Sequence, residues 1–105
     1  MPTPPYVLTK GAEADLFAIA RYTDIEWGEA QRKRYIRQIE TVASELAKGA
    51  GVYRQRDDLY PGVRIRLAGH HYVFCLPQDD GPALILAILH ERMDLIVKLN
   101  ERLDG

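Results

Sequence analysis

Ala83-Leu84-Ile85-Leu86-Ala87-Ile88-Leu89 is the stretch that decides the fold, because every residue in it is apolar. A short apolar run that follows a turn sequence, here Pro77–Pro82, is typical of a strand that is buried on both faces. A chain of this length has few helices with which to cover both faces. We therefore expect this strand at the centre of a sheet, with part of one face left for a binding partner to cover.

Two further strands are expected before this run, and a helix after it. In Val63–Leu67, apolar residues alternate with arginines, which is the period of a half-buried strand. A tight turn at 68–70 then leads into Tyr72–Leu76, which should pair antiparallel with Val63–Leu67. The last strand continues to His90. A short helix is expected to begin near Asp94, with Leu95, Leu99 and Leu103 on one face.

The N-terminal half of the sequence predicts a strand and two helices. Tyr6–Leu8 is expected at an edge of the sheet, and Thr9 can cap a helix that ends at Gly28. A second helix is expected over Glu29–Lys48, ended by Gly49, and the short link makes the two helices an antiparallel hairpin. The segment 53–62 is expected to be irregular. The order β-α-α-β-β-β-α predicts an α+β fold, in which an antiparallel sheet of about four strands carries the hairpin on one face and ends in a short C-terminal helix.

Length and composition indicate a single domain over residues 1–105, since 47% apolar residues suffice for one core. The 14 basic and 15 acidic residues give a net charge of -1, which argues against direct nucleic-acid binding. The single cysteine, Cys75, can form no internal disulfide or metal cluster. Residues 1–5 lack the pattern of a signal peptide, and the longest apolar run is too short to cross a membrane. We expect a cytoplasmic protein with no metal, no cofactor and no membrane contact.

Three arginines are the first candidates for a binding site, because guanidinium groups bind carboxylates and phosphates bidentately. They are Arg64, Arg66 and Arg92; the alternative is that they only keep a sheet face solvated. His90 and Glu91, with Arg66, could supply the acid, base and cation for RNA cleavage, and Tyr60 or His71 could join this set. The alternative is that His90 is a structural residue at a strand end. No established catalytic motif occurs in the sequence, which favours a binding protein over an enzyme.

Aromatic residues in the first helix give two further expectations. Phe17 lies off the main apolar stripe of that helix and is expected to be an exposed contact residue. Trp27, at the end of the helix, is expected to fill the turn between the two helices instead.

Several short motifs occur here in an order and spacing that closely resemble the ParE-type toxins of the RelE/ParE superfamily. These motifs are Ala12–Leu16 after the opening strand, Tyr22 with Trp27-Gly28, Pro61–Arg64, and Ile88–Asp94. The resemblance extends from about Tyr6 to Leu103. It implies a toxin of a bacterial type II toxin–antitoxin system that inhibits DNA gyrase and is neutralised by a ParD-type antitoxin, whose C-terminal tail wraps around the toxin.

The resemblance also implies contact residues and leaves one alternative activity open. For the antitoxin we expect contacts at Arg64, Arg66, Arg92, Leu16 and Phe17; for gyrase we expect contacts at Arg92 and Leu99. No residue is assigned a catalytic role. The alternative is a RelE-type toxin that cleaves mRNA on the ribosome, but the chain lacks the lysine-rich sheet face and the C-terminal catalytic tyrosine of that branch, and its net charge is not basic.

Overall fold

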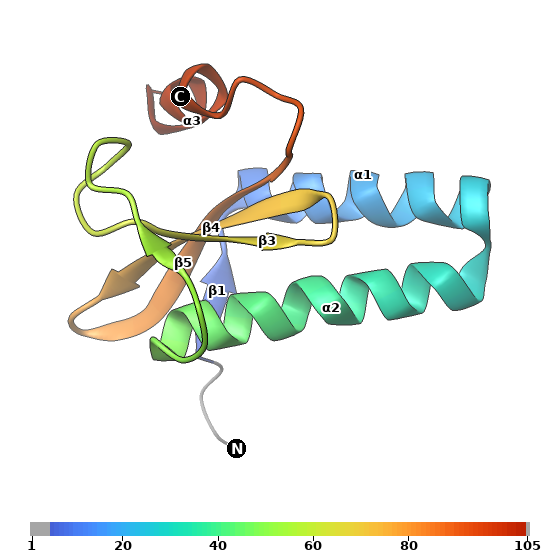
Figure 1. Ribbon diagram of the computed structural model, residues 1–105, viewed down its shortest axis with the longest axis horizontal. Coiled ribbons are helices and arrows are strands. Elements are labelled where there is room, and N and C mark those ends of the chain that lie inside the picture. The colour runs from blue at the N-terminus through green and yellow to red at the C-terminus, as the bar shows by residue number, and fades with distance from the viewer. Residues whose placement is uncertain (1–4, 105) are drawn as a thin grey trace.

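The computed structural model describes residues 5–104, which form an α+β layer structure (Figure 1). Its elements in chain order are β1 (Tyr6–Leu8), α1 (Lys10–Trp27), α2 (Glu29–Lys48), β2 (Arg54–Gln55), β3 (Arg64–Ala68), β4 (His71–Gln78), β5 (Gly81–His90) and α3 (Leu95–Asp104). The expected α+β fold is confirmed, and the helix bounds agree closely with those expected. No helix within residues 5–104 is long and apolar enough to cross a bilayer.

The sheet has five strands in the order β1-β5-β4-β3-β2, so the expected count of about four is too low. The additional strand is β2, which pairs antiparallel with β3 inside the segment that was expected to be irregular. β1 lies at the edge, as expected, but it pairs parallel with β5, so the sheet is not purely antiparallel. The helical hairpin makes this possible, because parallel neighbours need a long crossover connection.

Local capping chemistry sets the ends of both long helices. The Thr9 hydroxyl accepts a hydrogen bond from the Ala12 N–H at 3.2 Å and so caps α1. Gly49 ends α2 with φ of 71°, in the left-handed region that glycine adopts without strain. The two helices pack against each other, and Figure 1 shows the hairpin extending well past the edge of the sheet.

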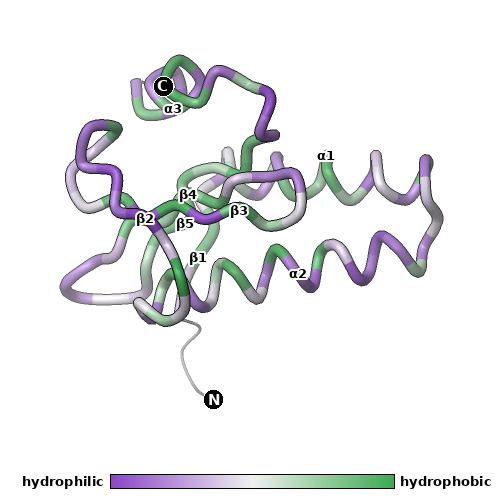
Figure 2. Tube along the Cα trace, in the orientation of Figure 1, coloured by the Kyte–Doolittle hydropathy of each residue, from purple (hydrophilic) through white to green (hydrophobic). Residues whose placement is uncertain are grey.

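The two faces of the sheet carry two separate cores. On the hairpin side, Ile39, Val42 and Leu46 of α2 pack with Ile85 and Ile88 of β5. On the α3 side, Leu99 packs with the apolar cluster Val63, Ile65, Phe74, Leu86, Ala87 and Leu89. In Figure 2 the hydrophobic colour is concentrated in the central strands and alternates with hydrophilic colour along α2.

The apolar run in β5 is buried on both faces, as expected, but by the chain itself. Ala83 and 85–89 are all buried in the isolated chain, so the expectation that a partner must cover this strand is wrong. A bulge helps to achieve this, because Phe74 pairs with Ala87 and Cys75 with Ile85. Leu86 is therefore left without a partner in β4, and the alternation of side chains between the two faces is reset there.

Candidate functional site

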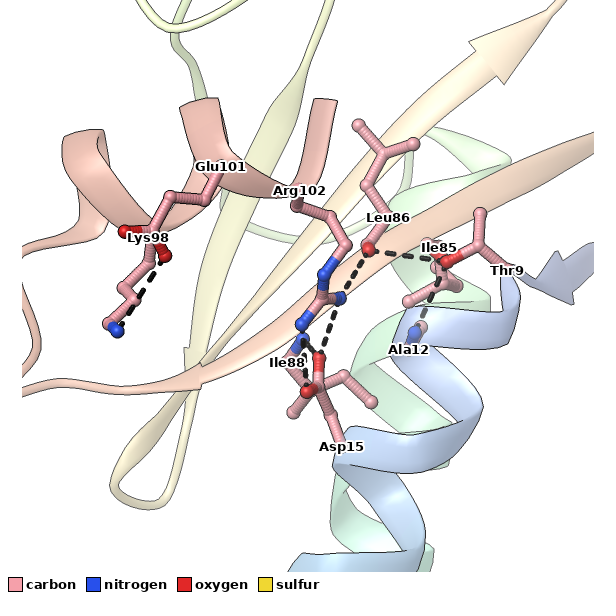
Figure 3. Close-up of polar contacts among 9 residues, drawn as sticks. All are labelled: Thr9, Ala12, Asp15, Ile85, Leu86, Ile88, Lys98, Glu101 and Arg102. Atoms are coloured by element: carbon pink, nitrogen blue, oxygen red, sulfur yellow. Dashed lines mark hydrogen bonds and ion pairs between the residues drawn. The ribbon is translucent and has the colours of Figure 1, made fainter. Parts of the chain in front are cut away.

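A cleft of about 680 Å³ lies between the start of α1, the middle of β5 and α3. Its apolar floor includes Leu86 and Leu89 of β5. Its polar lining consists of Thr9 and Asp15 from the α1 side and Lys98, Glu101 and Arg102 from α3. Figure 3 shows the Arg102 side chain reaching from α3 across β5 to Asp15 on α1. The cleft is thus the place where three elements distant in sequence meet.

A charge-assisted network joins these three elements. Arg102 makes a bidentate ion pair with Asp15, with both N···O distances 3.0 Å, and its Nη1 also donates to the Leu86 carbonyl at 3.0 Å. Asp15 Oδ2 in turn accepts the Ile88 N–H at 2.9 Å. The side chains of Arg102 and Asp15 are 29% and 17% exposed, so solvent screens this pair less than a surface pair.

The network provides hydrogen bonds to the backbone of β5 along the part of its edge that β1 is too short to cover. The register of β1 on β5 ends at Leu8 opposite Ile85, and beyond it Leu86 and Ile88 have no strand neighbour on that side. The Thr9 hydroxyl lies 3.2 Å from the Leu86 carbonyl, so side chains of α1 and α3 replace the missing strand. Such groups must be paired, because an unpaired buried peptide group costs about 1–3 kcal/mol.

A second polar cluster lies at the C-terminal end of β5, where three histidines and Tyr35 of α2 meet. The His71 Nδ1 and the Tyr35 hydroxyl are 2.6 Å apart, and the His71 and His90 rings lie edge to face at 5.1 Å. His70 Nδ1 is 3.2 Å from Glu91 Oε1. Burial, followed by the charges of His90 and His70, lowers the pKa of His71 to about 4, so this imidazole is neutral at pH 7.

The histidine cluster is a structural junction between α2 and the sheet. The Tyr35 hydroxyl also donates to the Ala68 carbonyl and accepts the His70 N–H, so it closes the β3–β4 turn onto α2. His90 Nδ1 accepts the Arg92 N–H at 3.1 Å, which fits the structural alternative for His90 at a strand end. No group of three or more potential ligands within residues 5–104 has the geometry to hold a metal ion.

Comparison with known proteins identifies the family. Residues 6–95 match the model of the family described as the ParE toxin of the type II toxin–antitoxin system, parDE. The chain is also 52% identical over 100 residues to Toxin ParE of Escherichia coli, covering 95% of this chain and 97% of that protein. The chain belongs to the ParE toxin family.

More distant ParE relatives and a solved structure agree with this assignment. Toxin ParE1 of Mycobacterium tuberculosis is 31% identical over 90 residues, covering 86% of this chain and 92% of that protein. A chain from the chromosomal ParDE TA system of P. aeruginosa has the same fold, with a TM-score of 0.64 at 21% identity over 81% of this chain and 92% of that chain. The resemblance inferred from the short motifs is therefore confirmed.

Two of the arginines expected to contact a ParE antitoxin are engaged inside this ParE fold. Arg64 and Arg66 share one face of β3, as expected, but that face points to α2. Arg64 Nη1 donates to the Leu46 carbonyl at 2.8 Å, and its guanidinium lies 5.0 Å from the centre of the Tyr53 ring. Arg66 pairs with Glu45. These half-buried arginines hold the C-terminal end of α2 on the sheet, where the helix dipole favours a cation.

The other expected contact residues of this ParE chain differ in exposure. Arg92 is exposed in the loop after β5, and Phe17 on α1 is 70% exposed. Leu16 is half-buried against the hairpin core. Leu99 of α3 is fully buried against the sheet, so its side chain is not accessible to a partner while α3 is docked. Trp27 is 71% exposed and does not fill the helix–helix turn, which corrects that expectation.

The Asp15–Arg102 pair was missed because its two members are far apart in the sequence. Asp15 lies near the start of α1, where any acidic residue is favoured by the helix dipole. Arg102 lies in a helix with a simple leucine repeat and carries no local signal of its own. The sequence feature that accompanies this pair is Gly11, one turn before Asp15. A Cβ at this position would lie 2.6–2.8 Å from atoms of Arg102, so the glycine leaves room for the Arg102 side chain.

Proposed function

We propose that the chain inhibits DNA gyrase by binding it and is neutralised by a ParD-type antitoxin. Family membership over almost the whole described chain supports this proposal, since the family is described as the ParE toxin of a type II toxin–antitoxin system and the E. coli relative is a Toxin ParE. The RelE-type alternative needs a free cation to bind the scissile phosphate. Arg66, the cation considered for that role, is instead paired with Glu45, which favours inhibition by binding over RNA cleavage.

The outer face of α1 is the surface that best fits the antitoxin. Phe17 and Ile25 lie on this face and Tyr22 lies at its flank, and all three are largely exposed. Large exposed apolar side chains on one helix face mark interaction sites in soluble proteins. An antitoxin tail that folds on binding would place its own apolar residues here and an acidic residue near Arg92. Arg64 and Arg66 are needed to hold α2, so we assign them no direct contact.

A supercoiling assay tests the activity. Purified chain added to gyrase and relaxed plasmid should prevent supercoiling, and an equimolar amount of the ParD-type antitoxin should restore it. Undiminished supercoiling at a large excess of toxin would refute gyrase inhibition. Cleavage of translated mRNA in a cell-free extract, with supercoiling intact, would establish the RelE-type alternative.

Two substitutions test the antitoxin surface. Phe17→Ser and Arg92→Glu should each weaken antitoxin binding by about tenfold or more, the effect expected of an interface hot spot. Arg34→Glu is the matched control, because Arg34 is exposed and bonds to Gln31 within α2. Calorimetry with each purified variant, checked for an unchanged melting temperature, gives the affinities. An equal loss for Arg34→Glu would show that overall charge, and not this surface, determines binding.

For gyrase we propose Arg92 as a contact and give Leu99 an indirect role through the seating of α3. Arg92→Glu should then lower inhibition of supercoiling in the absence of antitoxin. Full inhibition by the Arg92→Glu variant would exclude Arg92 from the gyrase interface, without affecting the antitoxin assignment.

A further inference from the structure

The attachment of α3 differs from that of the other helices. α1 and α2 pack against each other and against several strands, whereas α3 packs chiefly against β5. Within Leu95–Asp104, Leu99 is the one fully buried residue, and Ile96 and Val97 are 53% and 48% exposed. One buried leucine contributes about 2–3 kcal/mol, well below the 5–15 kcal/mol of a whole domain.

The Arg102 network supplies a second attachment, and Gly11 provides the space for it. The guanidinium passes directly over Gly11 of α1 to reach Asp15 and the Leu86 carbonyl. Any side chain at position 11 would collide with it. Arg102 therefore fastens the last turn of α3 to α1 and β5 at one point, far along the helix from its start at Leu95.

The loop before α3 is fixed at its beginning. The Glu91 N–H donates to the His70 carbonyl at 2.8 Å, the Arg92 N–H to His90 Nδ1 and the Met93 N–H to the His90 carbonyl. The Asp94 side chain caps α3 by accepting the Val97 N–H at 3.2 Å, so the N-terminal cap of the helix does not depend on the sheet or on α1. A pivot at Met93, just before the cap residue Asp94, would therefore let α3 move as an intact helix while the end of β5 stays in place.

We propose that α3 is a hinged cover, locked by Arg102, that opens as a unit while the hairpin and the sheet stay folded. Opening breaks the Arg102 contacts and withdraws Leu99, and it exposes an apolar sheet face that includes Phe74, Leu86 and Leu89. Asp15 keeps its bond to the Ile88 N–H, so the edge of β5 remains paired. The chain thus has a second, transient apolar surface on the face opposite the hairpin. This device belongs to the chain alone and does not depend on which target the toxin inhibits.

Native-state hydrogen exchange by NMR, on the purified full chain, tests the cover. The amides of 99–103 should share one opening free energy that lies below that of the α2 core amides. Arg102→Gln should accelerate their exchange by about tenfold, as expected for loss of a charge-assisted pair, and leave the Ile88 amide protected. Lys98→Gln is the matched control, because its pair with Glu101 lies on the same helix but is largely exposed.

A second substitution separates the lock from general destabilisation. Gly11→Ala should favour the α1 helix by its intrinsic propensity, yet it should open α3 because the new Cβ displaces Arg102. Faster exchange in α3 with unchanged or slower exchange in α2 would support the lock. Three results would overturn the proposal: α3 amides that exchange only on global unfolding, protection that decreases gradually towards the C-terminus as in fraying, or equal effects of Arg102→Gln and Lys98→Gln.

Discussion

Replacing Leu99 by alanine should remove most of the apolar attachment of α3. Leu99 is completely buried against the β3–β5 face of the sheet. Loss of its side-chain carbons costs about 0.8 kcal/mol per methylene in transfer free energy, and the cavity adds to this, so core Leu→Ala changes cost about 2–5 kcal/mol. Here the loss of unfolding free energy cannot exceed the free energy with which α3 docks on the sheet. Once α3 is released, the residue at position 99 no longer affects the stability of the rest of the domain. We expect about 2–3 kcal/mol.

Urea unfolding followed by circular dichroism measures this loss. The midpoint should fall, and the m-value should fall as well, because a variant with α3 already released exposes less surface on unfolding. The melting temperature should drop by about 8–24 °C, taking about 4–8 °C per kcal/mol for a domain of this size. Ile96→Ala is the matched control on the same helix: Ile96 is 53% exposed, and we expect a loss below about 1 kcal/mol.

Two results would refute this reasoning. Equal losses for Leu99→Ala and Ile96→Ala would mean that α3 is not seated through Leu99. A loss of 4–5 kcal/mol with an unchanged m-value would mean that α3 unfolds together with the rest of the domain, which would also contradict the hinged cover.

Further predictions concern acid stability, one helix end and the cysteine. The fold lowers the pKa of His71 from 6.5 to about 4, so between these pH values the unfolded state binds a proton at position 71 that the folded state does not. The stabilisation that neutral His71 provides is therefore complete above about pH 6.5 and is lost as the pH falls towards 4. Melting temperatures of wild type and His71→Gln should therefore converge on acidification, and parallel curves would contradict this. Gly49→Ala should destabilise by about 1 kcal/mol or more, because Gly49 has φ of 71°, whereas Gly81→Ala, with open space around its Cβ, should change the urea midpoint little. Burial raises the pKa of Cys75 to about 11, so the native protein should resist iodoacetamide at pH 8 until it unfolds; rapid labelling without urea would show that β4 opens locally.

Features set by neighbouring residues could be read from the sequence. Thr9, Gly28 and Gly49 fix the ends of the helices through capping and glycine conformations that are local to each site. The alternation in β3 and the tight turn after it likewise need only adjacent residues. For this reason the helices, β3 to β5 and their antiparallel pairing were predictable.

Features set by distant residues could not be read in this way. The alternation of β3 predicts that Arg64 and Arg66 share a face, but not that this face receives the C-terminal end of α2. Asp15 and Arg102 are 87 positions apart, and neither position is unusual for its helix. The parallel pairing of β1 depends in the same way on where the hairpin returns the chain. In each case a local pattern fits several arrangements, and tertiary packing selects one of them.

The burial of β5 changes where a partner is expected to bind. The apolar run 83–89 predicts an uncovered apolar surface on the sheet, because a chain of this length has few helices with which to cover both faces. The hairpin and α3 do cover it, and α1 instead carries several largely exposed apolar residues, among them Phe17, Tyr22 and Ile25. The sheet face is then available only when α3 opens. A partner that binds α1 needs no conformational change, whereas a partner that binds the sheet face must also supply the free energy of opening α3. Arg102→Gln should therefore tighten binding of a sheet-face partner and leave binding at α1 unchanged, so this one variant distinguishes the two surfaces for any partner of the toxin.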